Sequence, residues 1–346
     1  MSWLLPPLEP HFEAALRDVH ARTTEARTAA ARRLGKPEQG RQLDAERGLL
    51  MLLQDPQTVV RGAALRSLRD IGSEATHGPV LARIEDPDPL IRELAVIALA
   101  NIEHPNRASA LLQALARPEP EVRFQALGAC AELCPEDAIA EILTATRDPD
   151  VSIREAATRA LGCVRAEDGR VNSRLRALLE DSKPGVRLEA ALVLAKAAEP
   201  AAVPHLTAAL AGPTTRLDAL DGLSHYTLAE ARAAVYTLGR RVLISPLYNA
   251  AAGRALLHMG DRNRAIECLR DALVALRREG RNLALETIRD FRVSELAGEV
   301  RRLERRARGA DPALVVETAT RIAAPATCEA GPPDRTPAAK GRQDPP

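Results

Sequence analysis

The stretch that decides the fold is Asp86–Leu99, with the sequence DPDPLIRELAVIAL. Asp88 is suited to cap the start of a helix, because its carboxylate can accept hydrogen bonds from free backbone N–H groups. Pro89 suits the first helical position, where no backbone N–H is needed. Apolar residues then recur every four positions along one helix face, at Ile91, Ala95 and Leu99. The stretch therefore predicts a tight turn that leads into an amphipathic helix.

The same pattern recurs nine times along the chain. Its marker position recurs every 29 to 34 residues, at Arg27, Arg61, Arg92, Arg123, Arg154, Arg187, Arg216, Asn249 and Arg281. Three residues later stands an alanine in every copy: Ala30, Ala64, Ala95, Ala126, Ala157, Ala190, Ala219, Ala252 and Ala284. Seven residues later stands an apolar residue: Leu34, Leu68, Leu99, Cys130, Leu161, Leu194, Leu223, Leu256 and Ile288. A period of this size predicts an all-α fold, an α-solenoid or superhelix of about nine helix pairs.

The alanine marks the centre of the predicted packing face. A methyl group there lets the neighbouring helix approach closely, while larger residues fill the space above and below. Ala126→Leu is therefore expected to be more harmful than Leu127→Ala, since Leu127 is expected to lie off the seam between helices. The glycines at or near helix ends are expected to form left-handed caps: Gly35, Gly72, Gly162 and Gly260.

An aspartate precedes several marker arginines by six residues, usually followed by proline. With this Asp-Pro turn and the register of Arg, Ala and Leu, the chain over roughly residues 20 to 295 resembles the HEAT-repeat family. It is most similar to the short, phycobilisome-lyase HEAT-like repeat of bacterial proteins. That resemblance implies a structural ladder of aspartate and arginine, here Asp55, Arg61, Asp86, Arg92, Arg123, Asp148, Arg154, Asp181 and Arg187.

The ladder interpretation also has a physical basis. Each arginine lies in the first turn of its helix, where the helix dipole disfavours a cation by about 0.3–1 kcal/mol. The aspartate six residues earlier, in the same turn or an adjacent one, is the expected compensation. The alternative is a basic stripe that binds an acidic partner.

The domain organisation follows from where the repeats fade. We expect a solenoid over residues 1–310, closed by a last helix near Ser294 to Arg308. Residues 311–346 are expected to be a disordered tail rich in proline and alanine. Removal of residues 324–346 is expected to leave the fold intact, because such a composition buries too little apolar area to offset the entropy of ordering.

Composition argues against several functional classes. The net charge is +1 and the 346 residues include three Phe, three Tyr and one Trp, too few aromatics for a typical pocket around a large planar cofactor. No cofactor or metal is expected: the seven histidines form no His-Glu pair, whereas HEAT-like deoxyhypusine hydroxylases carry iron on such motifs. An odd number of cysteines, without a signal peptide or a membrane span, indicates a reducing, cytoplasmic location: Cys130, Cys134, Cys163, Cys268 and Cys328.

The C-terminal third departs most from the repeat. Residues 240–308 hold 16 arginines against 9 acidic residues, so they could meet phosphates or an acidic protein surface. Alternatively, the arginines of 301–308 form a solvated face paired with Glu299 and Glu304. All the tyrosines also gather near here. The candidate partner-binding residues are His225, Tyr226, Tyr236, Tyr248 and Asn249, although Tyr236 and Tyr248 could instead fill the space left by a missing ladder arginine.

The sequence favours a non-catalytic scaffold or adaptor that presents the concave surface of the solenoid to an unknown protein partner. A nucleic-acid-binding protein that uses the basic C-terminal third is the first alternative. A lyase-type cofactor chaperone is the second, suggested by the family resemblance alone.

Overall fold

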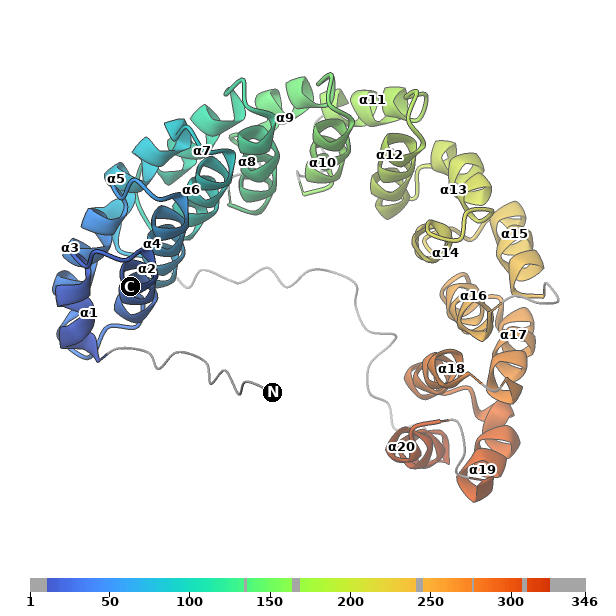
Figure 1. The fold of residues 1–346 in the computed structure, drawn as a ribbon. Coiled ribbons are helices and arrows are strands. Elements are labelled where there is room, and N and C mark those ends of the chain that lie inside the picture. The colour runs from blue at the N-terminus through green and yellow to red at the C-terminus, as the bar shows by residue number, and fades with distance from the viewer. Residues whose placement is uncertain are drawn as a thin grey trace, which may run out of the picture. The chain divides into compact units, whose positions relative to one another are not determined.

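The chain folds into helices that follow one another in pairs (Figure 1). The computed structural model describes residues 11–133, 136–163, 169–240, 245–275, 277–306 and 310–323, and within these ranges it contains helices and turns but no strand. The chain divides into two compact units, residues 1–193 and 194–346, and the boundary between them falls inside a helix. The all-α solenoid fold predicted from the sequence is thus confirmed.

In the first unit the helices lie in two layers (Figure 1). The layer of first helices comprises α1 (Phe12–Asp18), α3 (Gln42–Leu52), α5 (His77–Leu81), α7 (Arg107–Leu115), α9 (Ile139–Ala145) and α11 (Gly169–Leu178). The layer of second helices comprises α2 (Thr24–Leu34), α4 (Thr58–Ile71), α6 (Pro89–Asn101), α8 (Pro120–Leu133), α10 (Val151–Leu161) and α12 (Pro184–Lys196), whose last residues belong to the second unit. Short 3-10 turns, η1 (Glu74–Thr76) and η2 (Ala82–Glu85), flank α5.

The second unit repeats this plan with four further pairs. Its first helices are α13 (Val203–Ala209), α15 (Ala229–Gly239), α17 (Arg262–Val274) and α19 (Ala297–Arg306). Its second helices are α14 (Arg216–Leu223), α16 (Pro246–His258), α18 (Arg278–Asp290) and α20 (Pro312–Ala323). The 3-10 turns η3 (Pro200–Ala202) and η4 (Ser294–Leu296) precede α13 and α19. We call the second helices of either unit its second-helix layer.

The nine repeated alanines form the seam of the core. Every one of them has a relative exposure of 0%: Ala30, Ala64, Ala95, Ala126, Ala157, Ala190, Ala219, Ala252 and Ala284. The nine apolar residues four positions further on are also buried, none more than 2% exposed. Consecutive second helices pack on one another within each unit, as α4 does on α6 and α16 on α18. A small side chain at this position therefore allows the close approach of neighbouring helices.

The turn residues act as the sequence indicates. The Asp88 carboxylate accepts a hydrogen bond from the Leu90 backbone N–H at 3.0 Å, and Pro89 opens α6. Asp150 caps α10 in the same way, through the Ser152 backbone N–H at 2.8 Å. Each cap satisfies a backbone donor that the helix itself leaves free.

The prediction of left-handed glycine caps is correct for two of the four glycines. Gly72 and Gly260 have φ values of 65° and 78°. Gly35 and Gly162 are right-handed instead, so the prediction is wrong for them. Gly35 is needed for space: a Cβ atom there would lie 2.5 Å from the Ser67 Oγ of α4.

Two other expectations need correction. Leu127 is fully buried, as is Ala126, so Leu127 does not lie off the seam and the expected order of the two substitutions is reversed. The tail does not begin at residue 311, because Pro312–Ala323 forms α20, which packs on α18 and α19. Its buried residues Val315 and Thr318 extend the core of the second unit. Residues 324–346 lie outside the described ranges, so the truncation stays a prediction.

Gly280 of α18 lies in close contact with the start of α16. A Cβ atom on Gly280 would lie 2.4 Å from the Pro246 carbonyl carbon, which belongs to the backbone and cannot move aside. Gly280→Ala is therefore expected to destabilise the protein by about 1–3 kcal/mol. The control is Gly128→Ala in α8, where a Cβ would meet nothing within 4 Å and the better helix propensity should stabilise by about 0.5–1 kcal/mol. Urea unfolding of both variants measures these changes, and changes of the same sign would contradict the account.

Candidate functional site

The repeated arginines bind the end of the preceding helix. Arg61 Nη1 donates to the backbone carbonyls of Asp55 and Pro56, at 2.9 and 3.1 Å, just after α3 ends. The carbonyl six residues earlier accepts a hydrogen bond from each of the other repeated arginines: Arg27, Arg92, Arg123, Arg154, Arg187, Arg216 and Arg281. For Arg61 these carbonyls lie in the turn beyond α3, three and four residues after Leu52. The charged hydrogen bonds therefore fasten the start of the second helix to the turn that precedes it.

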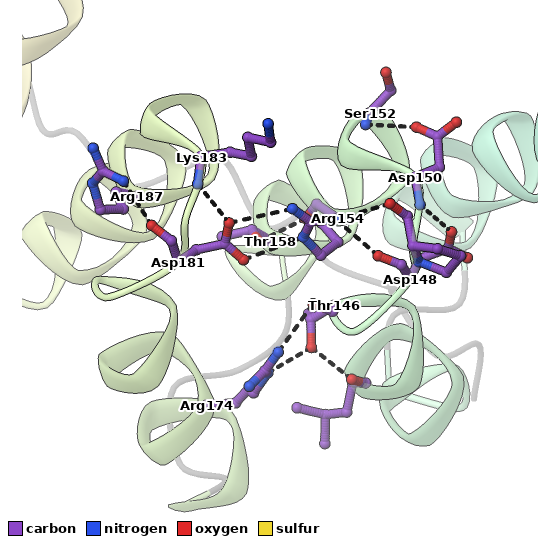
Figure 2. A network of polar contacts seen from close by, with 12 residues as sticks. Thr146, Asp148, Asp150, Ser152, Arg154, Thr158, Arg174, Asp181, Lys183 and Arg187 are labelled. Atoms are coloured by element: carbon purple, nitrogen blue, oxygen red, sulfur yellow. Dashed lines mark hydrogen bonds and ion pairs between the residues drawn. The ribbon is translucent and has the colours of Figure 1, made fainter.

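The same guanidinium groups reach the carboxylate of the next repeat. Arg61 Nη2 lies 2.8 Å from Asp86 Oδ1, and both side chains are buried. Four more pairs continue the ladder: Arg27 with Asp55, Arg92 with Glu121, Arg123 with Asp148, and Arg154 with Asp181. Figure 2 shows the last of these pairs. Four aspartates therefore bind the arginine of the previous repeat with the side chain and that of their own repeat with the backbone: Asp55, Asp86, Asp148 and Asp181.

The aspartates also fix their own turns. Asp55 Oδ1 accepts the backbone N–H of Gln57 at 2.9 Å, and Asp86, Asp148 and Asp181 bind the N–H two residues on in the same way. Burial works to raise the pKa of Asp55, but the hydrogen bonds from Arg27 and Gln57 outweigh it and lower the pKa below its ordinary value. Asp55 therefore stays charged in the fold and holds two repeats together.

The ladder adapts where the aspartate is missing. Arg117 stands six residues before Arg123, so Arg92 bonds instead to Glu121 in the first turn of α8. Arg187 donates to the Asp181 carbonyl at 2.6 Å and meets no carboxylate among the described residues. Arg216 lies over the Tyr248 ring, 4.7 Å from its centroid, so a cation–π contact stands in for the ion pair.

The candidate partner-binding tyrosines are engaged within the molecule. Tyr226 is only 3% exposed, and its hydroxyl donates to the Glu199 carbonyl at 2.8 Å. Burial raises the pKa of Tyr226 to about 12. The prediction that Tyr226 contacts a partner is therefore wrong, because its aromatic ring belongs to the core.

The other candidate residues are half-buried. The Tyr236 hydroxyl bonds to Glu267 of α17 at 2.6 Å, and the Tyr248 hydroxyl bonds to the Pro213 carbonyl at 3.1 Å. Asn249 replaces a ladder arginine, and its Oδ1 is buried without a hydrogen bond to a described residue. The two tyrosine hydroxyls thus join consecutive repeats. A role of His225, Tyr236, Tyr248 and Asn249 in partner binding stays a prediction.

The basic C-terminal third is partly neutralised by ion pairs between consecutive repeats. They join Arg262 to Glu295, Arg270 to Glu299, Arg278 to Asp311 and Arg289 to Glu317, at 2.7 to 3.3 Å. Glu299 thus pairs with α17 rather than with the arginines of its own helix. Arg301, Arg302 and Arg305 of α19 are exposed and form no ion pair with a described residue.

No group of three or more potential metal ligands occurs among the described residues. Cys130 is buried at its core position in α8, whereas Cys134 and Cys328 lie outside the described ranges. Burial raises the pKa of the Cys268 thiol to about 12, so the neutral thiol packs as a small apolar group. No helix in the described part of the chain has the length and apolar character needed to span a membrane.

Two histidines form a contact that the sequence did not indicate. His77 at the start of α5 is buried, and its ring stacks on that of His104 with centroids 3.9 Å apart and an angle of 10°. The His77 Nε2 is buried with no hydrogen-bond partner in the described structure. Burial, and then the proximity of His104, lower the pKa of His77 below its ordinary value of 6.5.

The stacked His77 and His104 are expected to make the stability of the fold depend on pH. Because the unfolded chain protonates His77 more readily than the folded chain, stability is expected to fall as the pH drops below about 6.5. His77→Phe should flatten this dependence, and His20→Phe at an exposed site serves as control. Urea unfolding midpoints at pH 7.5 and pH 5.5 measure the effect (both values chosen to lie about one unit either side of an ordinary histidine pKa). Equal pH dependence in His77→Phe and the natural chain would contradict it.

Large apolar side chains are exposed on three consecutive second helices of the first unit. Val59 in α4 is 59% exposed, Leu90 in α6 is 51% and Phe124 in α8 is 42%. We call these three residues the apolar row. Val59 and Leu90 each stand two positions before a ladder arginine, and Phe124 stands one position after. Their exposure could not be predicted from the sequence, because an apolar residue beside a buried one is expected to belong to the same core face.

Comparisons with known proteins agree with this geometry. The family model of HEAT repeats matches residues 10–100, 46–117, 78–162 and 139–224. Among curated proteins, no sequence matches the chain. Of the solved structures, importin beta is 12% identical over 90% of this chain and 52% of its own length, with a TM-score of 0.59. That likeness shows the fold.

Two further solved structures are similar over most of their length. YibA of E. coli is 16% identical, with coverage of 85% of this chain and 95% of its own and a TM-score of 0.48. The complex of CpcE and CpcF of phycocyanin lyase from Nostoc sp. PCC7120 gives 22% identity, coverage of 75% and 97%, and a TM-score of 0.40.

Proposed function

We propose that this chain, which belongs to the HEAT-repeat family, is a non-catalytic scaffold that binds a protein partner through its second-helix layers in the cytoplasm. The observation that carries the proposal is the apolar row of Val59, Leu90 and Phe124. Exposed apolar side chains that gather on one surface are typical of sites of protein association. The row lies on the second-helix layer of the first unit.

The ladder supports this function without taking part in binding. Arg61 and Arg92 hold α4 and α6 to the turn of the following repeat, through Asp86 and Glu121. Their charged groups are thereby engaged inside the array. A surface whose helices are fixed in advance loses less entropy when a partner binds, which suits a scaffold.

The test compares three forms of the full chain as baits in extracts of the native cell. The first is the natural chain, and the second carries Val59→Ser, Leu90→Ser and Phe124→Ser. The third, Leu43→Ser, is the matched control, because Leu43 is 68% exposed but lies on the first-helix α3. We expect a partner that the natural chain and the control retain and the triple variant loses. A partner lost by the control and kept by the triple variant would contradict the proposal.

A second candidate function is nucleic-acid binding, favoured by the exposed Arg301, Arg302 and Arg305 of α19. Anisotropy of a labelled DNA duplex at several salt concentrations tests it. If α19 binds phosphates, replacement of each contacting arginine by glutamine reduces the slope of log affinity against log salt by about 0.9. An equal slope in the triple glutamine variant would exclude this site.

A further inference from the structure

A groove crosses the second-helix layer of the second unit. Its volume is about 220 Å³. Ala251 and Ala255 of α16 form its floor, Leu217 and Leu220 of α14 one wall, and Leu283 of α18 the other. All three helices belong to the second unit, and α16 packs on both α14 and α18.

The groove arises because α16 carries small residues on more than one face. Its run of three alanines and Gly253 leaves the helix thin. Gly253 faces α17 so closely that a Cβ atom there would lie 2.7 Å from Leu269 Cγ. On the outer face Ala251 rises no higher than its methyl group, while Leu217 is 42% exposed beside it. Leu217 of α14 and Leu283 of α18 therefore project beyond the small side chains of α16 and form the walls of the groove.

The groove is large enough for one large apolar side chain. A cavity of roughly 150 Å³ lined by apolar residues admits a benzene ring, and the groove exceeds that volume. Five of its lining residues are aliphatic, and the others are Asp221, Ser224, Arg254 and His258. A leucine or phenylalanine side chain can pack on the aliphatic part, where removal of apolar surface from water is favourable.

One cation at the groove, Arg254, forms only a long ion pair within the described structure. The Arg254 side chain lines the groove and is 41% exposed. Its nearest carboxylate is Asp290 at 3.8 Å, which lies closer to Arg289, at 3.0 Å. Arg254 donates no hydrogen bond to a residue within the described ranges. Its guanidinium thus has donors to offer a ligand carboxylate, which it could bind in a bidentate manner.

We propose that this groove binds an acidic, amphipathic protein segment. The segment inserts one large apolar side chain between Leu217 and Leu283 and places a carboxylate of a neighbouring residue against Arg254. The proposal rests on the scaffold function and specifies which side chains of the partner are recognised, namely one apolar and one acidic side chain. Asp221, on the α14 side of the groove, disfavours a second carboxylate there and so sets the direction of the segment.

The experiment selects peptides from a random phage-displayed library on the immobilised full chain. We expect the enriched peptides to share a leucine or phenylalanine with an aspartate or glutamate close by. The strongest peptide is then labelled and titrated against variants. Arg254→Glu should weaken binding at least tenfold, and a peptide whose acidic residue is replaced by arginine should recover affinity for this variant. Asp221→Asn should leave the affinity equal or raise it.

Two further variants complete the design. Ala251→Phe fills the groove and should abolish binding, with circular dichroism to check the fold. Arg321→Glu is the matched control for charge reversal, since Arg321 is an exposed arginine of α20 in the same unit, and it should leave affinity unchanged.

The outcomes separate this proposal from the scaffold function. Enrichment of basic or purely polar peptides would overturn the proposal that the groove binds an acidic segment. Binding unaffected by Arg254→Glu would overturn it as well. Peptides that lose binding in Leu90→Ser and Phe124→Ser but keep it in Ala251→Phe would contradict the groove proposal and support the scaffold function. A library that yields no binder to either surface contradicts both.

Discussion

Replacement of Arg61 by alanine is expected to lower the free energy of unfolding by about 3–5 kcal/mol. The substitution leaves Asp86, which is 4% exposed, as a buried charge without its main partner. It also removes the donor that binds the Asp55 and Pro56 carbonyls. Urea unfolding of the full chain, followed by circular dichroism, measures the change.

Arg187→Ala is the matched control. Arg187 occupies the same position of the repeat, but it donates to one carbonyl and meets no carboxylate in the described structure. Loss of that single charged hydrogen bond is expected to cost about 1.5 kcal/mol. Equal losses in the two variants would show that the carboxylates contribute little and that the ladder account is wrong.

Leu127→Ala is expected to cost about 2–5 kcal/mol, because it removes a fully buried side chain and leaves a cavity in the core. Ala126→Leu, at the neighbouring seam position, is expected to cost about 1–3 kcal/mol through overpacking. The thermal midpoints of the two variants, measured side by side, decide the order. A smaller loss of stability in Leu127→Ala than in Ala126→Leu would mean that α8 moves to fill the cavity left by the leucine.

The repeat register could be predicted from the sequence because each position has one dominant requirement. A buried alanine is needed wherever two helices touch, and all nine alanines satisfy it. The Asp-Pro turn likewise has a local cause, since Asp88 caps the helix that Pro89 opens. Such features depend on residues only a few positions apart, which is why a single sequence reveals them.

Features that depend on the next repeat were harder to predict. Which carboxylate each arginine binds depends on how repeats stack, so Glu121 could not be assigned to Arg92 by spacing alone. The helix α20 was missed because its buried face holds Val315 and Thr318 within a segment of otherwise mixed composition. The groove is formed by the absence of side chains on α16, and the pattern of small residues there was read only as a packing seam.

The most direct test of the central claim is amide hydrogen exchange of the full chain with and without its captured partner. The account predicts that protection on binding falls on the second helices, namely α4, α6 and α8 around the apolar row and α14, α16 and α18 around the groove. The first helices α3, α5 and α7 should exchange as before. Protection confined to the first helices, with the second helices unchanged, would contradict the claim that this molecule binds its partner through its second-helix layers.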